Sequence, residues 1–206
     1  MNRKRVGILV FPEVEVLDFC GPFEVFSVTR LEAHRRDEPS PFEVLLVAEK
    51  PGPVFTTGGM KVIPDHTLDD CPRLDILVVP GGWGTRTERK NARLVAWIAE
   101  RAKQVETLTS VCTGSLLLGQ AGLLDGRRAT THWRALDLMR ELFPAVKVEE
   151  TLHVVEEGNV LTSAGISAGI DMALRVVARY HGEAVARATA RNMEYRYVPE
   201  DNSRRV

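Results

Sequence analysis

The sequence has few cysteines and no apolar run long enough to cross a membrane. Its 206 residues include three cysteines, Cys20, Cys71 and Cys112, an odd number without a C-x-x-C pair. This set favours neither a disulfide framework nor a zinc site, so no metal is expected. The basic amino end runs directly into an apolar stretch of strand length, without the cleavage pattern of a signal peptide. We therefore expect reduced thiols, a cytoplasmic location and no membrane partner.

An excess of charge of one sign is also absent. Lys and Arg number 27 against 28 Asp and Glu, for a formal net charge of -1, and the two signs are interspersed. Such a balance gives no electrostatic reason to expect binding to nucleic acid or to an anionic membrane. The sequence also lacks the G-x-G-x-x-G and G-K-[ST] patterns of phosphate-binding loops. The expected partner is a small neutral organic molecule.

Strand-like runs alternate with amphipathic helical patterns along the chain. Arg5 to Phe11 and Leu74 to Val79 are almost continuously apolar, which is typical of strands buried on both faces of a parallel sheet, and Val105 to Val111 is rich in β-forming residues. Apolar residues recur at helical spacing in Glu88 to Lys103 and in Ala168 to His181. The alternation predicts an α/β fold with a flavodoxin-like, doubly wound, mostly parallel sheet and helices on both faces.

Shorter segments complete this prediction. Pro51 to Leu68 is predicted to form a small hairpin, and Val146 to Glu149 a strand that extends the sheet. His34 to Pro41 is charged and contains proline, so we expect a surface loop there. The length and a hydrophobic content of 44% suit one domain. We assign residues 1–198 to this domain and residues 199–206 to a polar tail that frays.

Cys112 lies where the strand from Val105 to Val111 meets the apolar helix that follows Gly114. The carboxyl ends of parallel strands form the edge at which open α/β sheets bind ligands. The S-x-C-T-G pattern is similar to the nucleophile elbow of hydrolases, with cysteine in place of serine. The amino end of the helix is expected to lower the pKa of the thiol. Cys112 is therefore a candidate catalytic nucleophile, and a small buried apolar residue is the alternative.

Asp18 precedes a helix that is predicted to begin near Pro22, and it follows the first strand toward the same sheet edge. An Asp in this position often caps a helix, which is the alternative to a functional role. Beside a thiolate, a carboxyl group tends to keep its proton and can donate it. Asp18 is therefore a candidate general acid.

Two further groups of residues are candidates for the same site. Gly81 and Gly82 follow the strand that ends at Val79, and with Trp83 they form either an oxyanion or substrate-binding loop or a simple tight turn. His132 ends a short predicted strand outside the cysteine turn. We expect it either to support the cysteine indirectly or to be structural.

Three stretches resemble the DJ-1/PfpI superfamily, and the resemblance covers nearly the whole chain. They are FPEVEVLDFCGPFEVF (11–26), VVPGGWG (78–84) and SVCTGSLLLGQAGLLDGRRATTHW (110–133), supported by LTSAGISAGIDMAL (161–174). Together they resemble the subgroup that contains isonitrile hydratases and the amino-terminal sensor domains of AraC-type regulators. Thr113 stands where PfpI-like peptidases carry histidine, and Asp18 takes the place of the glutamate of peptidase and glyoxalase members. The resemblance therefore disfavours both of those activities.

The resemblance implies a cysteine-dependent hydratase without a metal or cofactor. Its Cys112 thiolate attacks the terminal carbon of an isocyanide, protonated Asp18 supplies a proton to that carbon, and water then releases an N-substituted formamide. The Thr113 hydroxyl is expected to hold Asp18 or water. Since such proteins are commonly homodimers, a homodimer is expected. The alternative is a non-catalytic ligand or redox sensor, related to the sensor domains of AraC-type regulators, although we do not expect their paired helix-turn-helix module here.

Overall fold

The computed structural model describes residues 3–32 and 37–204, so the loop predicted for His34 to Pro41 lies partly outside the described residues. At its centre is a seven-stranded sheet with the strand order β10-β11-β7-β6-β1-β2-β5. All neighbouring strands are parallel except β10 and β11, which are antiparallel. The strands of this sheet are β1 (Lys4–Leu9), β2 (Phe42–Ala48), β5 (His66–Thr67), β6 (Ile76–Val79), β7 (Thr107–Val111), β10 (Val154–Glu157) and β11 (Val160–Ser163).

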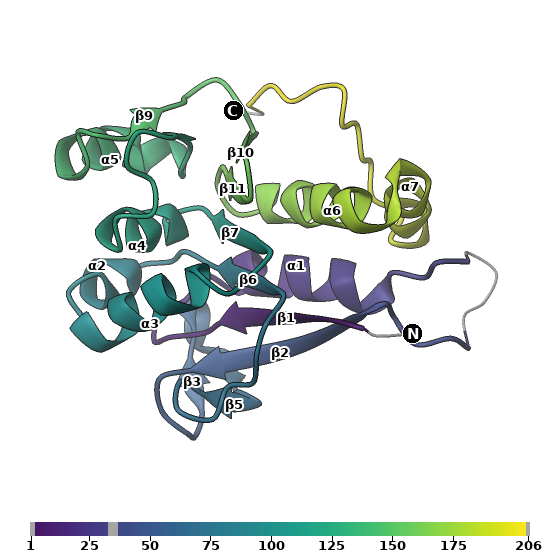
Figure 1. Ribbon diagram of the computed structural model, residues 1–206, viewed down its shortest axis with the longest axis horizontal. Coiled ribbons are helices and arrows are strands. Elements are labelled where there is room, and N and C mark those ends of the chain that lie inside the picture. Colours follow the sequence, from purple (N-terminus) through teal and green to yellow (C-terminus); the bar gives the residue numbers. More distant parts are fainter. Residues whose placement is uncertain (1–2, 33–36, 205–206) are drawn as a thin grey trace.

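Helices cover both faces of the sheet (Figure 1). One layer consists of α1 (Val16–Val28), α6 (Ala168–His181) and α7 (Glu183–Asn192), which contact one another. The other layer consists of α2 (Thr85–Glu88), α3 (Ala92–Ala102) and α4 (Gly114–Gln120), and α5 (Leu136–Leu142) lies beyond α4. The flavodoxin-like, doubly wound prediction is confirmed by this arrangement, in which the layers bury both faces of the central strands.

The two central strands are buried along their whole length. Every residue of β6 and β7 is inaccessible to solvent or nearly so. Strand β7 nevertheless contains polar side chains, and the Thr109 hydroxyl is satisfied by donating a hydrogen bond of 3.1 Å to the Leu77 carbonyl. On the helical side, the amphipathic pattern of α3 buries Leu94 and Ile98 as its spacing predicts. The core therefore lies on both sides of these strands.

Two small sheets flank the main one. β3 (Val54–Phe55) and β4 (Lys61–Val62) form the predicted hairpin, with the short 3-10 helix η1 (Thr57–Gly59) between them. The prediction that residues 146–149 extend the main sheet is wrong. β9 (Lys147–Val148) instead pairs with β8 (Arg128–Ala129), because the chain from α5 turns back beside the segment that follows α4.

Helix α1 begins six residues before the predicted start. Its first residue is Val16, so Asp18 lies inside the first turn instead of preceding the helix, and Glu15 occupies the capping position. Pro22 lies within α1, where its missing N–H leaves the Asp18 carbonyl without the usual helical donor. Asp18 is therefore placed by the helix and is not its cap.

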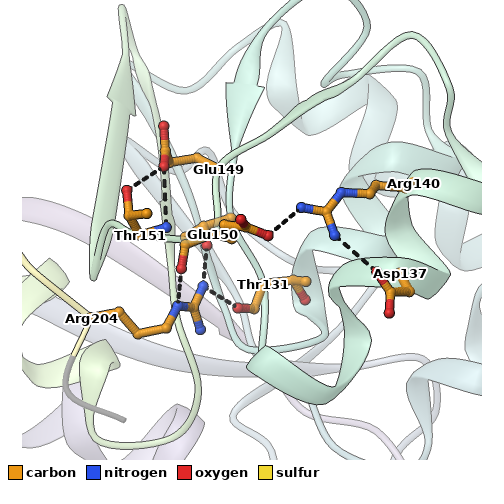
Figure 2. Close-up of polar contacts among 8 residues, drawn as sticks. Thr131, Asp137, Arg140, Glu149, Glu150, Thr151 and Arg204 are labelled. Carbon is orange, nitrogen blue, oxygen red and sulfur yellow. Dashed lines mark hydrogen bonds and ion pairs between the residues drawn. The ribbon is translucent and has the colours of Figure 1, made fainter.

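The end of the chain is held against the sheet. The Asn202 carbonyl accepts a hydrogen bond of 2.8 Å from the His153 amide, and its side chain donates one of 2.8 Å to the Val154 carbonyl. Arg204 donates to the Glu150 carbonyl over 2.6 Å and to the Thr131 carbonyl over 3.1 Å (Figure 2). The prediction that the tail frays is therefore wrong up to Arg204, and residues 205–206 lie outside the described part.

None of the helices in residues 3–32 and 37–204 combines the length and the apolar composition that a membrane span requires.

Candidate active site

The site is built where three neighbouring strands end. Val79 at the end of β6 is opposite Ser110 in β7, and Val111 at the end of β7 is opposite Ser163 in β11. The loops that follow these strands therefore start side by side. Strand β1 pairs with β6 on its other side, so the first turn of α1 reaches the same edge. This is the edge at which the sequence predicts a ligand site.

Cys112 occupies the sharp turn between β7 and α4. Its backbone has a φ of 54°, a left-handed conformation that is unfavourable for any residue other than glycine. The turn is held by several hydrogen bonds: the Cys112 N–H donates to the carbonyls of Ser163 and Ala164, and the Cys112 carbonyl accepts from the hydroxyls of Ser115 and Thr131. These contacts fix a strained backbone and, with it, the direction of the thiol.

A close approach of two backbones makes this turn possible. A Cβ on Gly114 would lie 2.0 Å from the carbonyl oxygen of Val79, so the start of α4 fits against the end of β6 only without a side chain. Gly81 is equally constrained, because a Cβ there would lie 2.5 Å from the Thr113 amide and 2.9 Å from Oδ2 of Asp18. The glycines of both motifs therefore serve packing at the site.

Asp18 is completely buried beside this turn, with a relative exposure of 0%. The Gly81 N–H donates a hydrogen bond of 2.9 Å to its Oδ2, while Oδ1 is buried without a hydrogen-bond partner among the described residues. Burial raises the pKa of Asp18 to about 8, and the charge of Glu15 raises it further, against lowering contributions from the Gly81 amide and Cys112. Asp18 therefore carries a proton at neutral pH, as the sequence predicts.

The Cys112 thiol, 6% exposed, behaves differently from the prediction. Burial raises its pKa well above the usual range, and the negative charge of Asp18 adds to this effect. The backbone and hydroxyl of Thr113 and the backbone of Ile166 lower the pKa by hydrogen bonding to the sulfur, but by less. The expected lowering by the helix is therefore wrong in its net sign, because α4 has only seven residues and the loss of water outweighs its amides.

Thr113, Gly81 and Gly82 have other partners than the sequence suggests. The Thr113 hydroxyl accepts a hydrogen bond of 3.1 Å from the Gly82 N–H and interacts with the Thr85 hydroxyl at 3.1 Å, instead of holding Asp18. The Gly81 N–H is engaged with Asp18. The amides of Gly81 and Gly82 therefore organise the acid and the turn, and the oxyanion role predicted for them is not supported.

A pocket with a volume of about 210 Å³ opens onto the thiol. Its wall contains five of the predicted site residues, Cys112, Thr113, Gly82, Trp83 and His132, whereas Asp18 and Gly81 do not line it. It also contains residues that the sequence analysis did not select: Glu15, Arg86, Arg134, Ala135 and Ile166. The signal for Ile166 was the small-residue loop in which it lies, whereas nothing in the local sequence marked the two arginines.

His132 lies in the pocket wall and caps the short 3-10 helix η2 (Trp133–Ala135) by accepting a hydrogen bond of 3.2 Å from the Arg134 N–H at its Nδ1. Burial lowers its pKa, and the positive charges of Arg134, Arg204 and Arg86 lower it further. His132 is therefore neutral at physiological pH. Its ring packs so closely on Gly165 that a Cβ there would lie 2.1 Å from Cδ2.

No three His, Cys, Asp or Glu side chains converge as metal ligands anywhere in residues 3–32 and 37–204. The three cysteines are free, and of these only Cys112 lies in the wall of the pocket.

These features define the class of the protein: a doubly wound α/β domain with a cysteine on the turn after a central parallel strand and a buried carboxyl group beside it. The chain belongs to the DJ-1/PfpI family, whose family model matches residues 4–179. That range contains the cysteine turn, the Gly81 loop and Asp18, so the resemblance seen in the sequence is confirmed.

Known relatives include an enzyme and transcriptional regulators. Isonitrile hydratase of Pseudomonas putida is 38% identical over 200 residues, which cover 97% of this chain and 82% of that protein. The HTH-type transcriptional regulator CdhR of Pseudomonas aeruginosa is 34% identical over 178 residues, 86% of this chain but only 51% of the regulator. The chain thus spans about half the length of that regulator.

Solved structures agree on the fold. The crystal structure of a ThiJ/PfpI family protein from Pseudomonas syringae superposes with a TM-score of 0.84 at 33% identity, over 97% of this chain and 78% of that one. Drosophila melanogaster DJ-1beta superposes with a TM-score of 0.78 at 18% identity, a likeness of fold alone.

Proposed function

We propose that the protein is an isonitrile hydratase-like enzyme that converts an isocyanide and water to an N-substituted formamide. The observation that carries the proposal is the buried pair of Cys112 and Asp18: a nucleophile in the wall of a small pocket, and a protonated acid that interacts with it from behind that wall. The terminal carbon of an isocyanide must receive both a nucleophile and a proton. A site with one group of each kind matches this requirement.

The first step joins the sulfur to the substrate. The reactive form of the pair holds one proton, and the reaction starts from the minor arrangement of it, with Cys112 as thiolate and Asp18 as carboxylic acid, in equilibrium with the thiol and carboxylate. The sulfur attacks the terminal carbon of R–NC while Asp18 transfers its proton to the same carbon, which gives a thioimidate, R–N=CH–S–Cys112, and an Asp18 carboxylate. Hydrogen bonds from the backbones of Thr113 and Ile166 stabilise the thiolate before attack.

The second step releases the product and restores the pair. A water molecule adds to the thioimidate carbon, its hydroxyl group bonding to carbon and its proton passing through Asp18 to the nitrogen. The C–S bond then breaks, the sulfur leaves as thiolate, and the remaining hydroxyl proton goes to the Asp18 carboxylate. The products are R–NH–CHO and the starting form of the pair, so one water is consumed for each isocyanide.

The infrared absorption of the isocyanide stretch measures this reaction directly. We expect the wild type to remove the absorption of a simple aryl isocyanide, Cys112→Ala to be inactive, and Asp18→Asn to lose about 10²- to 10⁴-fold in rate because the general acid is gone. Cys20→Ala is the matched control, since Cys20 is a half-buried thiol outside the pocket wall. Absence of turnover in the wild type would refute the proposal.

Two further expectations from the sequence belong to this proposal. A reduced Cys112 is required, in keeping with a cytoplasmic location. A homodimer would offer cover for exposed apolar side chains such as those of Leu17 (38% exposed), Ile166 (37%) and Trp83 (60%). Sedimentation equilibrium tests this point, and a monomer at micromolar concentration would contradict it.

A second candidate function is ligand sensing without catalysis, favoured by the 34% identity to the regulator CdhR. A redox form of this function is less well supported, because burial raises the pKa of the Cys112 thiol and oxidation favours exposed thiolates. The infrared experiment separates the two functions. A protein that binds an isocyanide without consuming it would support the sensor.

A further inference from the structure

Two arginines stand at the rim of the Cys112 pocket, and each is supported by a tryptophan. Arg86, in α2, has its guanidinium carbon 4.1 Å from the ring centre of Trp83. Arg134, in η2, has its guanidinium carbon 4.8 Å from the ring centre of Trp133. Stacking on an aromatic face restrains a long side chain and leaves the edge of the guanidinium, where its N–H donors lie, for another partner.

Neither guanidinium is neutralised by the protein. Within residues 3–32 and 37–204 no carboxylate lies within ion-pair distance of Arg86 or Arg134. Several other arginines do have such partners, for example Arg140, which pairs with Asp137 at 2.9 Å and with Glu150 at 2.6 Å (Figure 2).

With the other ionisable groups of the pocket taken into account, its net charge is positive. Glu15 is the one acidic residue among those lining it, and it lies on the Asp18 side, where its charge raises the Asp18 pKa. His132 and Asp18 are both neutral at physiological pH, because burial shifts the pKa of each toward its uncharged form. Two guanidinium groups against one carboxylate suit a ligand with a single negative charge, such as a carboxylate, better than a dianionic phosphate.

We propose that this pocket selects small electrophiles that carry a carboxylate, with Arg86 and Arg134 holding that group while the electrophilic carbon lies at Cys112. The inference deepens the proposed function and rests on it for the reaction, but the preference for an anion rests on the pocket alone. It also replaces the expectation of a neutral substrate. That expectation came from the net charge of the whole chain, which does not report the charge of one pocket.

Alkylation of Cys112 tests the preference without any catalytic turnover. Iodoacetate carries a carboxylate where iodoacetamide carries an uncharged amide, and the two reagents are otherwise alike. Mass spectrometry of the cysteine peptides gives the rate at which each reagent alkylates each cysteine. The ratio of the iodoacetate rate to the iodoacetamide rate is expected to be higher at Cys112 than at Cys20, which is in the same molecule but outside the pocket wall. Replacing both arginines by glutamine should lower the ratio at Cys112 roughly fivefold.

Arg89→Gln is the matched control, because Arg89 follows Arg86 by one helical turn and does not line the pocket. It should leave the ratio at Cys112 unchanged. Raising the salt concentration should reduce the ratio in the wild type and have little effect in the double variant, since both guanidinium groups face solvent. An identical ratio in the wild type and in the Arg86→Gln/Arg134→Gln variant would overturn the inference.

Turnover of isocyanoacetate and its ethyl ester separates this inference from the proposed function. A lower KM for the acid, raised in the double variant while the KM for the ester stays unchanged, supports both. Turnover of the ester with no preference for the acid, together with an unchanged alkylation ratio, upholds the hydratase and overturns the carboxylate preference. An arginine-dependent alkylation ratio without turnover of either compound upholds the preference and refutes the hydratase.

Discussion

The amide N–H of Gly81 lies 2.9 Å from Oδ2 of Asp18 and is the donor that holds this carboxyl group in the buried site. The two residues come from the loop after β6 and from the first turn of α1, and they meet at the end of β7. One carboxyl oxygen is thereby fixed, and the other is left without a hydrogen-bond partner among the described residues. Burial outweighs the single Gly81 donor and favours the protonated acid, which leads to the first three predictions below.

Asp18→Asn is expected to stabilise the protein, and more so as the pH rises. Because the folded pKa of about 8 lies above the unfolded value, the folded state binds the extra proton between about pH 4 and pH 8. The contribution of Asp18 to stability is therefore present at low pH and lost as the pH rises, at up to about 1.4 kcal/mol per pH unit. Urea denaturation of the wild type and the variant at pH 5 and pH 8 measures the difference, or gap, between their free energies of unfolding. A gap that does not grow with pH contradicts the prediction.

Turnover by the proposed hydratase is expected to increase with pH between 6 and 8. The reactive pair carries one proton, and the raised pKa values of Asp18 and Cys112 leave two protons on it in acid. The rate should rise about tenfold per pH unit while the pair is doubly protonated and level off near the Asp18 pKa of about 8. Initial rates with a neutral isocyanide test this, and a rate that falls over the same range argues against a one-proton reactive form.

The thiol of Cys112 should become more reactive when Asp18 is replaced by asparagine, although the hydratase activity of this variant is strongly reduced. The Asp18 carboxylate raises the pKa of Cys112, so its removal lowers that pKa and increases the thiolate fraction. The effect should appear only above about pH 8, where Asp18 is charged in the wild type. Iodoacetamide rates at pH 6.5 and pH 9 measure it, with Cys20 as the internal standard. Slower alkylation of the variant at pH 9 would reverse our assignment.

Gly81→Ala is expected to disturb the acid and the cysteine turn together. Its Cβ would lie 2.5 Å from the Thr113 amide and 2.9 Å from Asp18 Oδ2, and relief of such contacts costs about 1–3 kcal/mol. Gly122→Ala is the calibrating control. A Cβ at Gly122 would contact no other atom, but the backbone there has a φ of 70°. The substitution should therefore lower the free energy of unfolding by about 1–2 kcal/mol and leave activity unchanged. Equal activity of the two variants contradicts the role given to Gly81.

Cys112→Gly should be more stable than Cys112→Ala, against the usual order of these residues. Both variants lack the thiol, but alanine keeps the left-handed φ of 54° that glycine adopts without strain. A difference of about 1 kcal/mol is expected in the free energy of unfolding. Urea denaturation of the two variants decides it, and an advantage for alanine means that the turn relaxes when the thiol is removed.

The sequence predicts the features that depend on local patterns. Continuous apolar runs locate β1 and β6, and the cysteine after β7 and the glycines after β6 then fall at one sheet edge because parallel strands end together. The start of α1 was missed because Pro22 resembles a first-turn residue, whereas this helix accepts it in the interior.

Other features depend on contacts between distant segments and carry no local signal. The raised pKa of Cys112 results from burial by several elements, which outweighs the few amides of α4. Arg86 and Arg134 come from separate elements and meet only at the pocket rim. The polar composition of the tail predicts fraying, yet Arg204 donates hydrogen bonds to the carbonyls of Glu150 and Thr131, which lie more than fifty residues away in the sequence.

The contacts of residues 202–203 also cover one edge of the sheet. β10 is an edge strand, and an uncovered edge offers unpaired amides and carbonyls to strands of other molecules. Asn202 satisfies groups of His153 and Val154 at the start of β10, and Ser203 bridges to Leu152. The opposite edge, β5, has only two residues. Residues 202–203 therefore cover the start of this edge strand and limit its pairing with strands of other molecules.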